Sequence, residues 1–458
     1  MIEGLKPYAE YKESGLEWLG QVPRQWASFP LCRVATPKSE CGRTDLELLS
    51  VYLHRGVIRY ADSGGQVHKP SLDLSKYQVV APGDFVLNNQ QAWRGSIGVS
   101  KFQGIISPAY VVLKLSQKLN SDYANYLFRS PAMVAQYVAA SRGVGDIQRN
   151  LFYPDLRNSI AIVPPPDEQA AIVRFLDHAN RKIDGFIRAK RKLIGLLNEQ
   201  KQAIIHRAVT RGLHPDAPLK PSGIPWLGDI PSHWNIVPGM MGLREKQVKN
   251  IGMREKRVLS LSYGRIVIKP EEKLYGLVPE SFETYQIVSP GDIIIRPTDL
   301  QNDHTSLRVG LVKDRGIITC AYICLQTLLP FEIEYAYQLL NSYDFQKVFY
   351  GLGSGTRQNL SFSDFKRLPL PLAPRVEQLA IVEFISQQNA AILPVIARTE
   401  REIALMQEYR KRLTADLVMG KLDVREAAAK LPATIDEGNA KESSNEISEE
   451  SEEEILES

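Results

Sequence analysis

The chain carries one stretch twice, 209 residues apart, and each copy opens a long helical pattern. The first copy is Asp167–Leu176 (DEQAAIVRFL) and the second is Val376–Ile385 (VEQLAIVEFI). After each copy, apolar residues recur at alternating spacings of four and three, which is a heptad pattern. Each run has about 44 residues and would extend roughly 66 Å at 1.5 Å per residue. A helix of this length with one apolar stripe cannot bury that stripe alone, so the repeat predicts two long helices that pack together.

The predicted contact positions are related between the two helices by the same offset. They are Ile172, Leu176, Ala179, Ile183, Phe186, Lys190, Leu193, Leu197 and Ile204 in the first helix, and Ile381, Ile385, Gln388, Ile392, Val395, Thr399, Glu402, Met406 and Leu413 in the second. Lys190 and Glu402 interrupt the stripe. Prolines precede both helices, and Gly212 and Gly420 stand where the helices should end. Because a folded segment separates the helices, an antiparallel pair that acts as a rigid spacer is predicted. The alternative is two unrelated amphipathic helices, each packed on its own domain.

Further apolar residues lie beside the predicted contact positions and widen both stripes. They are Phe175, Ile187, Ile194, Ile205, Phe384, Ile396 and Ile403. A two-helix pair does not need so much apolar surface, and an exposed stripe is typical of a protein interface. The sequence therefore predicts that partner proteins dock on the helices.

The charge of the chain is distributed unevenly. Residues 434–458 contain ten acidic residues and one lysine, a net charge of −9, and are predicted to be disordered. The rest of the chain carries 55 basic and 42 acidic residues, a net charge of +13. A basic body indicates a polyanionic partner, although an excess of lysine and arginine is also common on a solvated surface. The sequence has no run of 18 consecutive apolar residues and no signal-peptide pattern at its start, so a cytoplasmic protein is predicted.

The segments before the two helices repeat as well. Tryptophan-containing arms, SGLEWLGQVPRQW at residues 14–26 and SGIPWLGDIPSHW at residues 222–234, are 208 residues apart, and their tryptophans are predicted to be hydrophobic anchors. Two strand–turn–strand segments around Pro82-Gly83-Asp84 and Pro290-Gly291-Asp292 have the same offset. A strand-rich segment and a short helix follow in each half. The fold class predicted is mixed α/β (α+β), a tandem repeat of two similar globular domains, separated by two long helices packed as an antiparallel coiled coil.

The cysteines and histidines do not form a metal-binding pattern. Cys320 and Cys324 lie in residues 317–325, which we interpret as one buried strand, and no further soft ligands lie nearby. The histidines form no His-Glu-x-x-His spacing, and the glycine-rich segment 351–357 lacks the Gly-Lys-Ser/Thr ending of a phosphate-binding loop. We expect no metal site in this chain.

These repeated motifs resemble the specificity subunit of type I restriction–modification enzymes. The resemblance covers residues 10–424 and rests on the doubled Trp-Leu-Gly-x-x-Pro-x-x-Trp arm, the doubled Pro-Gly-Asp turn and the doubled Glu-Gln-x-x-Ile helix start. It implies two target recognition domains that bind the halves of a bipartite asymmetric DNA site, and two spacer helices. The implied boundaries are 1–165 and 213–374 for the domains, 166–212 and 375–424 for the helices, and 425–458 for the tail.

The resemblance also implies partners and excludes catalysis by the chain itself. The implied partners are double-stranded DNA, two methyltransferase (M) subunits and the motor/nuclease (R) subunits, with no membrane. No cofactor is expected in this chain, because the methyl donor and ATP would belong to the partner subunits. The alternative function is a self-contained DNA methyltransferase or nuclease with a diverged active site. It is disfavoured because no methyltransferase motif that holds a flipped base and no nuclease carboxylate set is found in the sequence.

The predicted DNA-contacting residues lie on loops of the two globular domains. Arginine recognises guanine, and asparagine or glutamine recognises adenine, through pairs of hydrogen bonds to base edges. In the first domain the candidates are Asn89, Gln90, Gln91, Arg94, Arg142, Gln148 and Arg149. In the second domain they are Arg296, Thr298, Asp299, Gln301, Asn302, Arg357, Gln358 and Asn359.

Overall fold

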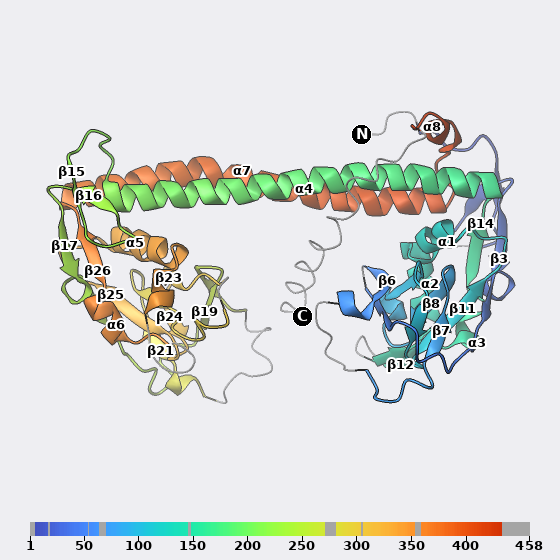
Figure 1. Ribbon diagram of the computed structural model, residues 1–458, viewed down its shortest axis with the longest axis horizontal. Coiled ribbons are helices and arrows are strands. Elements are labelled where there is room, and N and C mark those ends of the chain that lie inside the picture. Colours follow the sequence, from blue (N-terminus) through green and yellow to red (C-terminus); the bar gives the residue numbers. More distant parts are fainter. Residues whose placement is uncertain are drawn as a thin grey trace. The chain divides into compact units, whose positions relative to one another are not determined.

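The computed structural model describes residues 5–16, 19–53, 55–63, 70–144, 148–270, 281–303, 306–352 and 359–432. The chain divides into two units. Unit 1 contains Met1–Arg188 and Glu402–Ser458, and unit 2 contains Ala189–Arg401. The two long helices, α4 (Pro166–Arg211) and α7 (Arg375–Val418), each contribute one part to each unit (Figure 1).

Unit 1 is built around an antiparallel four-stranded sheet with the strand order β4-β11-β8-β9. Its remaining strands form antiparallel two-stranded pairs, β1 with β2, β3 with β14, β5 with β6, β7 with β10 and β12 with β13. The strands are β1 (Tyr11–Glu13), β2 (Gln21–Pro23), β3 (Ala27–Pro30), β4 (Ala35–Pro37), β5 (Leu49–Tyr52), β6 (Gly56–Arg59), β7 (Gln78–Val80), β8 (Asp84–Asn88), β9 (Ile97–Val99), β10 (Gly104–Ile106), β11 (Tyr110–Leu115), β12 (Arg142–Val144), β13 (Gln148–Asn150) and β14 (Ile160–Val163). The helices besides α4 and α7 are α1 (Ser121–Phe128), α2 (Pro131–Ala140), α3 (Tyr153–Leu156) and α8 (Arg425–Ala429).

Unit 2 repeats this plan with the strand order β18-β25-β22-β23 in its four-stranded sheet. Its strand pairs are β15 with β16, β17 with β26, β19 with β20 and β21 with β24. The strands are β15 (Leu219–Pro221), β16 (Asp229–Pro231), β17 (Asn235–Pro238), β18 (Leu243–Glu245), β19 (Leu259–Ser262), β20 (Arg265–Ile268), β21 (Gln286–Val288), β22 (Ile293–Ile295), β23 (Val309–Leu311), β24 (Gly316–Ile318), β25 (Ile323–Thr327) and β26 (Pro369–Leu372). The helices are α5 (Ile333–Phe345) and α6 (Phe362–Arg367). The predicted mixed α/β tandem repeat is confirmed.

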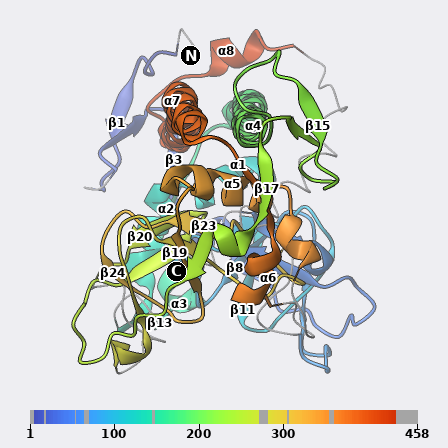
Figure 2. The ribbon, with the colours of Figure 1, turned by 90° about the vertical axis from the view of Figure 1, so that its left-hand side faces the viewer.

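The long helices pack against each other within each unit, and Figure 2 shows them side by side. In unit 1 the core joins Ile172 and Leu176 of α4 to Leu413 and Leu417 of α7. Further along α4, Asp184 accepts a hydrogen bond from Arg410 of α7. Residues with increasing numbers on α4 therefore contact residues with decreasing numbers on α7, which confirms the predicted antiparallel pairing.

The packing stripe follows many of the predicted positions, including Ile183, Ile392 and Thr399, which are buried, but departs from them locally. At the predicted contact position Val395, 45% of the residue is exposed, whereas the next residue, Ile396, is 8% exposed. Ile187 of α4, which stands 209 residues before Ile396, is 6% exposed. Leu193, a predicted contact position of α4, is 38% exposed. An α-helix has 3.6 residues per turn, so a straight pair cannot keep a 3.5-residue repeat over many turns. The strict heptad prediction was wrong at these positions.

Much of the predicted docking stripe is buried. Phe175, Ile187, Ile205 and Ile396 are buried, so they belong to the packing of the units rather than to a free surface. Among the apolar helix residues that stay exposed are Leu196 and Leu405, which are 209 residues apart.

The repeated Glu-Gln motif ties each globular core to the start of a long helix. Glu168 accepts a hydrogen bond from Trp26 Nε1 at 2.7 Å, and Glu377 accepts one from Trp234 Nε1 at 2.9 Å. Trp26 and Trp234 are fully buried, which confirms these two as anchors. Trp226 is half-buried, and Trp18 lies outside the described residues. The next residue, Gln169, accepts from Asn120 N just before α1 and donates to Pro164 O just before α4. Gln378 makes the equivalent bonds in unit 2.

Both long helices end at a glycine that packs on the anchoring tryptophan. Gly212 and Gly420 have φ angles of +71° and +73°, the left-handed conformation that ends many helices. A Cβ at Gly212 would lie 3.3 Å from Trp234 Cζ2, and one at Gly420 would lie 3.0 Å from Trp26 Cζ3. In unit 1 the segment that follows α7 is also bonded to the N-terminal segment, because Asp423 N donates a hydrogen bond to Lys6 O at 2.8 Å.

The cysteine segment differs from the prediction. Residues 317–325 form two strands, β24 and β25, with a turn between them in which Tyr322 N donates to Thr319 O. Cys320 lies in this turn and is exposed, whereas Cys324 is buried. The single buried strand was therefore wrong.

One part of α7 is long and apolar enough, by length and composition alone, to cross a membrane, and 22% of that window is buried. Core helices of globular proteins satisfy the same criterion. Within unit 2, Ile381 and Ile385 of α7 pack in one core with Ile205 and Val209 of α4.

Candidate nucleic-acid interface

The first group of predicted residues forms a tight loop after β8. Gln90 N donates to Asn88 Oδ1 at 3.0 Å, and Arg94 N donates to Gln91 O at 2.9 Å, which closes a 3₁₀ turn over Ala92–Arg94. The turn ends at Gly95, whose φ angle of +101° favours glycine. Gln90 and Arg94 are exposed, whereas Asn89 and Gln91 are half-buried.

The β12–β13 hairpin is fastened to this loop. Leu151 N, directly after β13, donates to Asn89 O at 2.9 Å. Two predicted arginines then share one aromatic ring, because Arg94 Cζ lies 4.7 Å and Arg149 Cζ 5.7 Å from the centroid of the Trp93 ring. The structure thus brings the loop and the hairpin into contact. The sequence predicted DNA-contacting residues in both segments but no contact between them. Trp93 was missed, although it is a lone aromatic residue in a polar loop.

The other hairpin candidates are placed differently. Arg142 is exposed and pairs with Asp155 at 2.6 Å. The backbone of Gln148 lies in β13, and the structure does not describe its side chain.

The second group of predicted residues forms the loop after β22, which is organised by a buried arginine. The Arg308 side chain has no exposed surface. Its guanidinium donates to Thr298 O at 2.6 Å, to Asp303 O at 2.6 Å and to Asp299 O at 3.3 Å. The guanidinium thus gives three backbone carbonyls a buried donor. Asp299 O also accepts from Asp303 N, and Asp303 O also accepts from Tyr350 Oη. No sequence pattern marked Arg308 for this role.

Most polar groups of this second loop bond to one another. Arg296 Nη1 lies 3.3 Å from Asp303 Oδ2. Asn302 Nδ2 donates to Asp299 Oδ1 at 2.8 Å, and Asp299 N donates to Asn359 Oδ1 at 3.2 Å. Asn359 is thereby brought to the loop, and Gln301 lies on it as an exposed residue. Arg357 and Gln358 lie outside the described residues.

A buried carboxyl group supports the Arg308 cluster from α5. Asp344 Oδ2 accepts a hydrogen bond from the backbone N of Arg308 at 2.5 Å. Burial raises the pKa of Asp344 to about 6. The charged form is disfavoured because a carboxylate loses hydration when it is buried.

The raised pKa gives a testable pH dependence. The unfolded chain releases the Asp344 proton near its ordinary pKa and the folded chain only near pH 6, so this group costs stability as the pH rises from about 4 to 6. Asp344→Asn keeps an oxygen acceptor and cannot ionise. We expect the variant to gain about 1–3 kcal/mol relative to wild type between pH 4 and pH 7, measured by hydrogen exchange of the β22 and β23 amides. A pH-independent difference would contradict this expectation.

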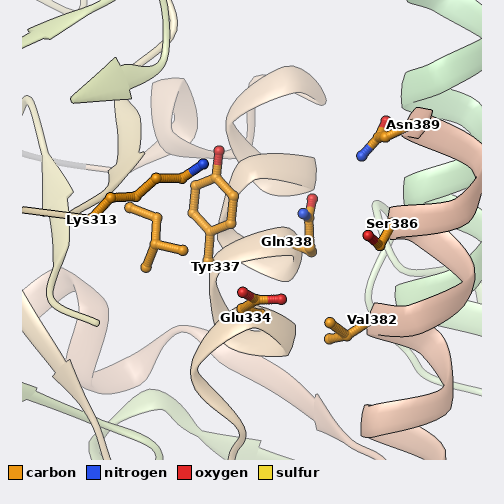
Figure 3. Close-up of a pocket in the computed structure, with 8 residues that line it drawn as sticks. Lys313, Glu334, Tyr337, Gln338, Val382, Ser386 and Asn389 are labelled. Atoms are coloured by element: carbon orange, nitrogen blue, oxygen red, sulfur yellow. The ribbon is translucent and has the colours of Figure 1, made fainter. Parts of the chain in front are cut away.

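A shallow pocket of about 170 Å³ lies in unit 2 between α5 and α7 (Figure 3). Val382, Ser386 and Asn389 of α7 face Glu334 and Gln338 of α5 across it. Over the described ranges, no group of three or more histidine, cysteine, aspartate or glutamate side chains could hold a metal ion.

Comparisons with known proteins identify the fold. No protein-family model matches the chain. No curated protein sequence matches it. A chain from a structure described as "Structural basis underlying complex assembly and conformational transition of the type I R-M system" is 14% identical. The alignment covers 87% of this chain and 98% of that one, with a TM-score of 0.61.

Two further solved structures match more weakly. The HsdS subunit from Thermoanaerobacter tengcongensis is 15% identical, with 87% of this chain and 98% of that chain covered and a TM-score of 0.44. The type I restriction–modification S subunit from M. genitalium is 13% identical, with 86% and 96% covered and a TM-score of 0.32. On the first of the three likenesses, this chain has the fold of a subunit of a type I restriction–modification system.

Proposed function

We propose that this chain is the specificity subunit of a type I restriction–modification complex, a sequence-specific DNA-binding protein without catalysis of its own. One observation carries the proposal. The two units share their framework, down to the bonds of Trp26 with Glu168 and Trp234 with Glu377, but present different loops after β8 and β22. A repeated fold with different polar loops suits a ligand with two different halves, and a bipartite asymmetric DNA site has that property.

The chemistry of the loops supports DNA as the ligand. The loop of unit 1 presents Arg94 beside Gln90, and the loop of unit 2 presents Gln301 and Asn302, all exposed. Arginine and amide side chains are the groups that distinguish bases in the major groove. The net charge of +13 outside residues 434–458 favours association with a polyanion. The target recognition domains are assigned to residues 1–165 and 213–374.

The long helices provide the spacer and the surface for partner subunits. Leu196 and Leu405 are 53% and 55% exposed and occupy equivalent positions on α4 and α7. Two equivalent apolar positions suit two copies of one partner, and we assign them to two methyltransferase subunits. The motor/nuclease subunits bind to the assembly of this chain with its two methyltransferase subunits. Methyl donor and ATP bind to the partners, and the complex acts in the cytoplasm.

The proposal is tested by selection from a pool of random duplexes. The chain is purified with and without its methyltransferase partner, and bound duplexes are sequenced. Enrichment of a split motif with a constant gap is expected. Binding with a steep salt dependence and no enriched motif would leave only charge-driven association and would refute the proposal. Methyl transfer by the chain alone would favour a self-contained enzyme instead.

The spacer role makes a separate prediction. Lengthening both helices by four residues, after Leu197 in α4 and after Leu393 in α7, adds about 6 Å of helix. We expect the preferred gap between the half-sites to grow by about one or two base pairs, because the bases of DNA are spaced about 3.4 Å apart. Both half-site sequences should stay the same in the selection. A shortened or unaltered gap would show that the helices do not set the distance.

A further inference from the structure

Trp93 joins two arginines from distant segments of unit 1. Arg94 follows Trp93 in the 3₁₀ turn, and Arg149 comes from β13 of the hairpin. Their Cζ atoms lie 4.7 Å and 5.7 Å from the centroid of the indole ring. Both distances are within the range in which a guanidinium is attracted to an aromatic face.

The indole is itself held in place. Trp93 Nε1 donates to Gln90 O at 2.9 Å, which ties the ring to the loop that carries it. The hydrogen bond from Leu151 N to Asn89 O ties the hairpin to the same loop. Arg149 is half-buried, and its Nη1 donates to Val138 O at 3.4 Å, whereas Arg94 is exposed. Arg94 is therefore the exposed arginine of the cluster, and it lies on a ring that is held in place.

This geometry has a chemical consequence. An arginine side chain in solution samples many rotamers, and ordering it on binding costs free energy. Contact with the indole restricts those rotamers before DNA arrives. A guanidinium held in one orientation donates two parallel hydrogen bonds, and O6 and N7 of guanine are the acceptor pair in the major groove that matches it.

We propose that Arg94 binds a guanine in the half-site recognised by unit 1, and that Trp93 is the positioning residue for Arg94. This inference rests on the proposed function, since it names a base within the site that the function requires. A contact to phosphate alone would not need an oriented guanidinium, because a flexible charge is enough for counterion release. Unit 2 also has an arginine on an aromatic ring, Arg308 at 5.2 Å from the Tyr350 ring centroid, but its side chain is buried.

The experiment begins with the motif selected by the wild-type complex. Each guanine of the half-site assigned to unit 1 is replaced by 7-deazaguanine, which lacks the N7 acceptor, and affinity is measured by titration. We expect one position at which 7-deazaguanine weakens wild-type binding roughly 10-fold or more. At that position the Arg94→Gln variant should bind guanine and 7-deazaguanine equally, and its affinity for the unmodified site should fall roughly 10- to 100-fold.

Trp93 is tested by a conservative pair. Trp93→Phe keeps an aromatic face and should retain most of the guanine preference, whereas Trp93→Leu should lose about 10-fold at the same guanine only. The salt dependence should stay unchanged in both variants, because no phosphate contact is removed. The matched control is a base change in the other half-site, which should weaken wild type and all variants by the same factor.

Several outcomes would overturn the inference. An equal loss on all sequences, with a shallower salt dependence, would reassign Arg94 to a phosphate. A selected half-site without guanine, or an Arg94→Gln variant that still discriminates 7-deazaguanine, would refute the contact. These results differ from a failure of the proposed function, in which the wild-type complex would enrich no split motif at all.

Discussion

Replacing Arg308 with methionine is expected to abolish recognition of the half-site bound by unit 2. The guanidinium is the common donor for the carbonyls of Thr298, Asp299 and Asp303, and methionine has no donor. The loop after β22 then loses the buried donor that joins three of its carbonyls, and its exposed amides lose their positions. We expect a loss of about 100-fold or more in affinity for the matched half-site, and a fall of about 3 kcal/mol in the unfolding free energy of unit 2.

The measurement compares wild type and Arg308→Met on duplexes with one half-site altered at a time. The variant should no longer distinguish bases in the half-site of unit 2 but should still discriminate in that of unit 1. Arg296→Met is the matched control, because the Arg296 side chain is 34% exposed and bonds at the edge of the same loop. If Arg308→Met kept full discrimination in both half-sites, the loop would not depend on the buried guanidinium.

Replacing either buried tryptophan with alanine is expected to destabilise its own unit by about 3–5 kcal/mol. Trp26 and Trp234 are both fully buried, and each donates from Nε1 to a glutamate at the start of a long helix. Removal of the ring leaves a cavity. In unit 1 it also leaves Glu168 without its indole donor, and the residue is 2% exposed. The loss of the donor to Glu168 Oε2 adds to the cost of the cavity, while Gln25 Nε2 still donates to Glu168 Oε1.

The two substitutions serve as controls for each other. Trp26→Ala should expose the amides of unit 1 to hydrogen exchange, and Trp234→Ala those of unit 2. The conservative changes Trp26→Phe and Trp234→Phe keep most of the apolar volume and should cost less, mainly the lost hydrogen bond. An equally large loss for phenylalanine and alanine would mean that the hydrogen bond to the glutamate, rather than the packing of the ring, holds the arm.

The elements that the sequence predicted well are those set by repetition and by local chemistry. The ends of α4 at Arg211 and of α7 at Val418 follow from the glycines at 212 and 420, which adopt the left-handed conformation as a helix terminates. The turns at Pro82-Gly83 and Pro290-Gly291 end β7 and β21 and begin β8 and β22 as predicted, although the two strands at each turn belong to different sheets. Each of these features depends on residues that are close together in the sequence.

The residues around the candidate interface were predicted only as loop positions. A polar loop of asparagine, glutamine and arginine shows where hydrogen-bonding groups are, but not which of them are used inside the protein. Arg296 bonds to Asp303, and Asp299 bonds to Asn302 and Asn359, so fewer groups face outward than the composition suggested. Arg308, whose guanidinium bonds to the carbonyls of this loop, comes later in the chain than the loop itself. No local sequence pattern identifies an arginine that will be buried.

The sequence by itself determined the repeat, the antiparallel helix pair and the tryptophan anchors, because a duplicated chain with apolar periodicity has few ways to bury its stripes. The tertiary structure decided which residues complete each stripe and each loop. Ile187 and Ile396 replaced the expected heptad positions because a helix turns every 3.6 residues. Trp93 contacts Arg149, and Arg308 donates to Thr298 O, because folding brings these residues together. The sequence around each residue does not reveal these contacts.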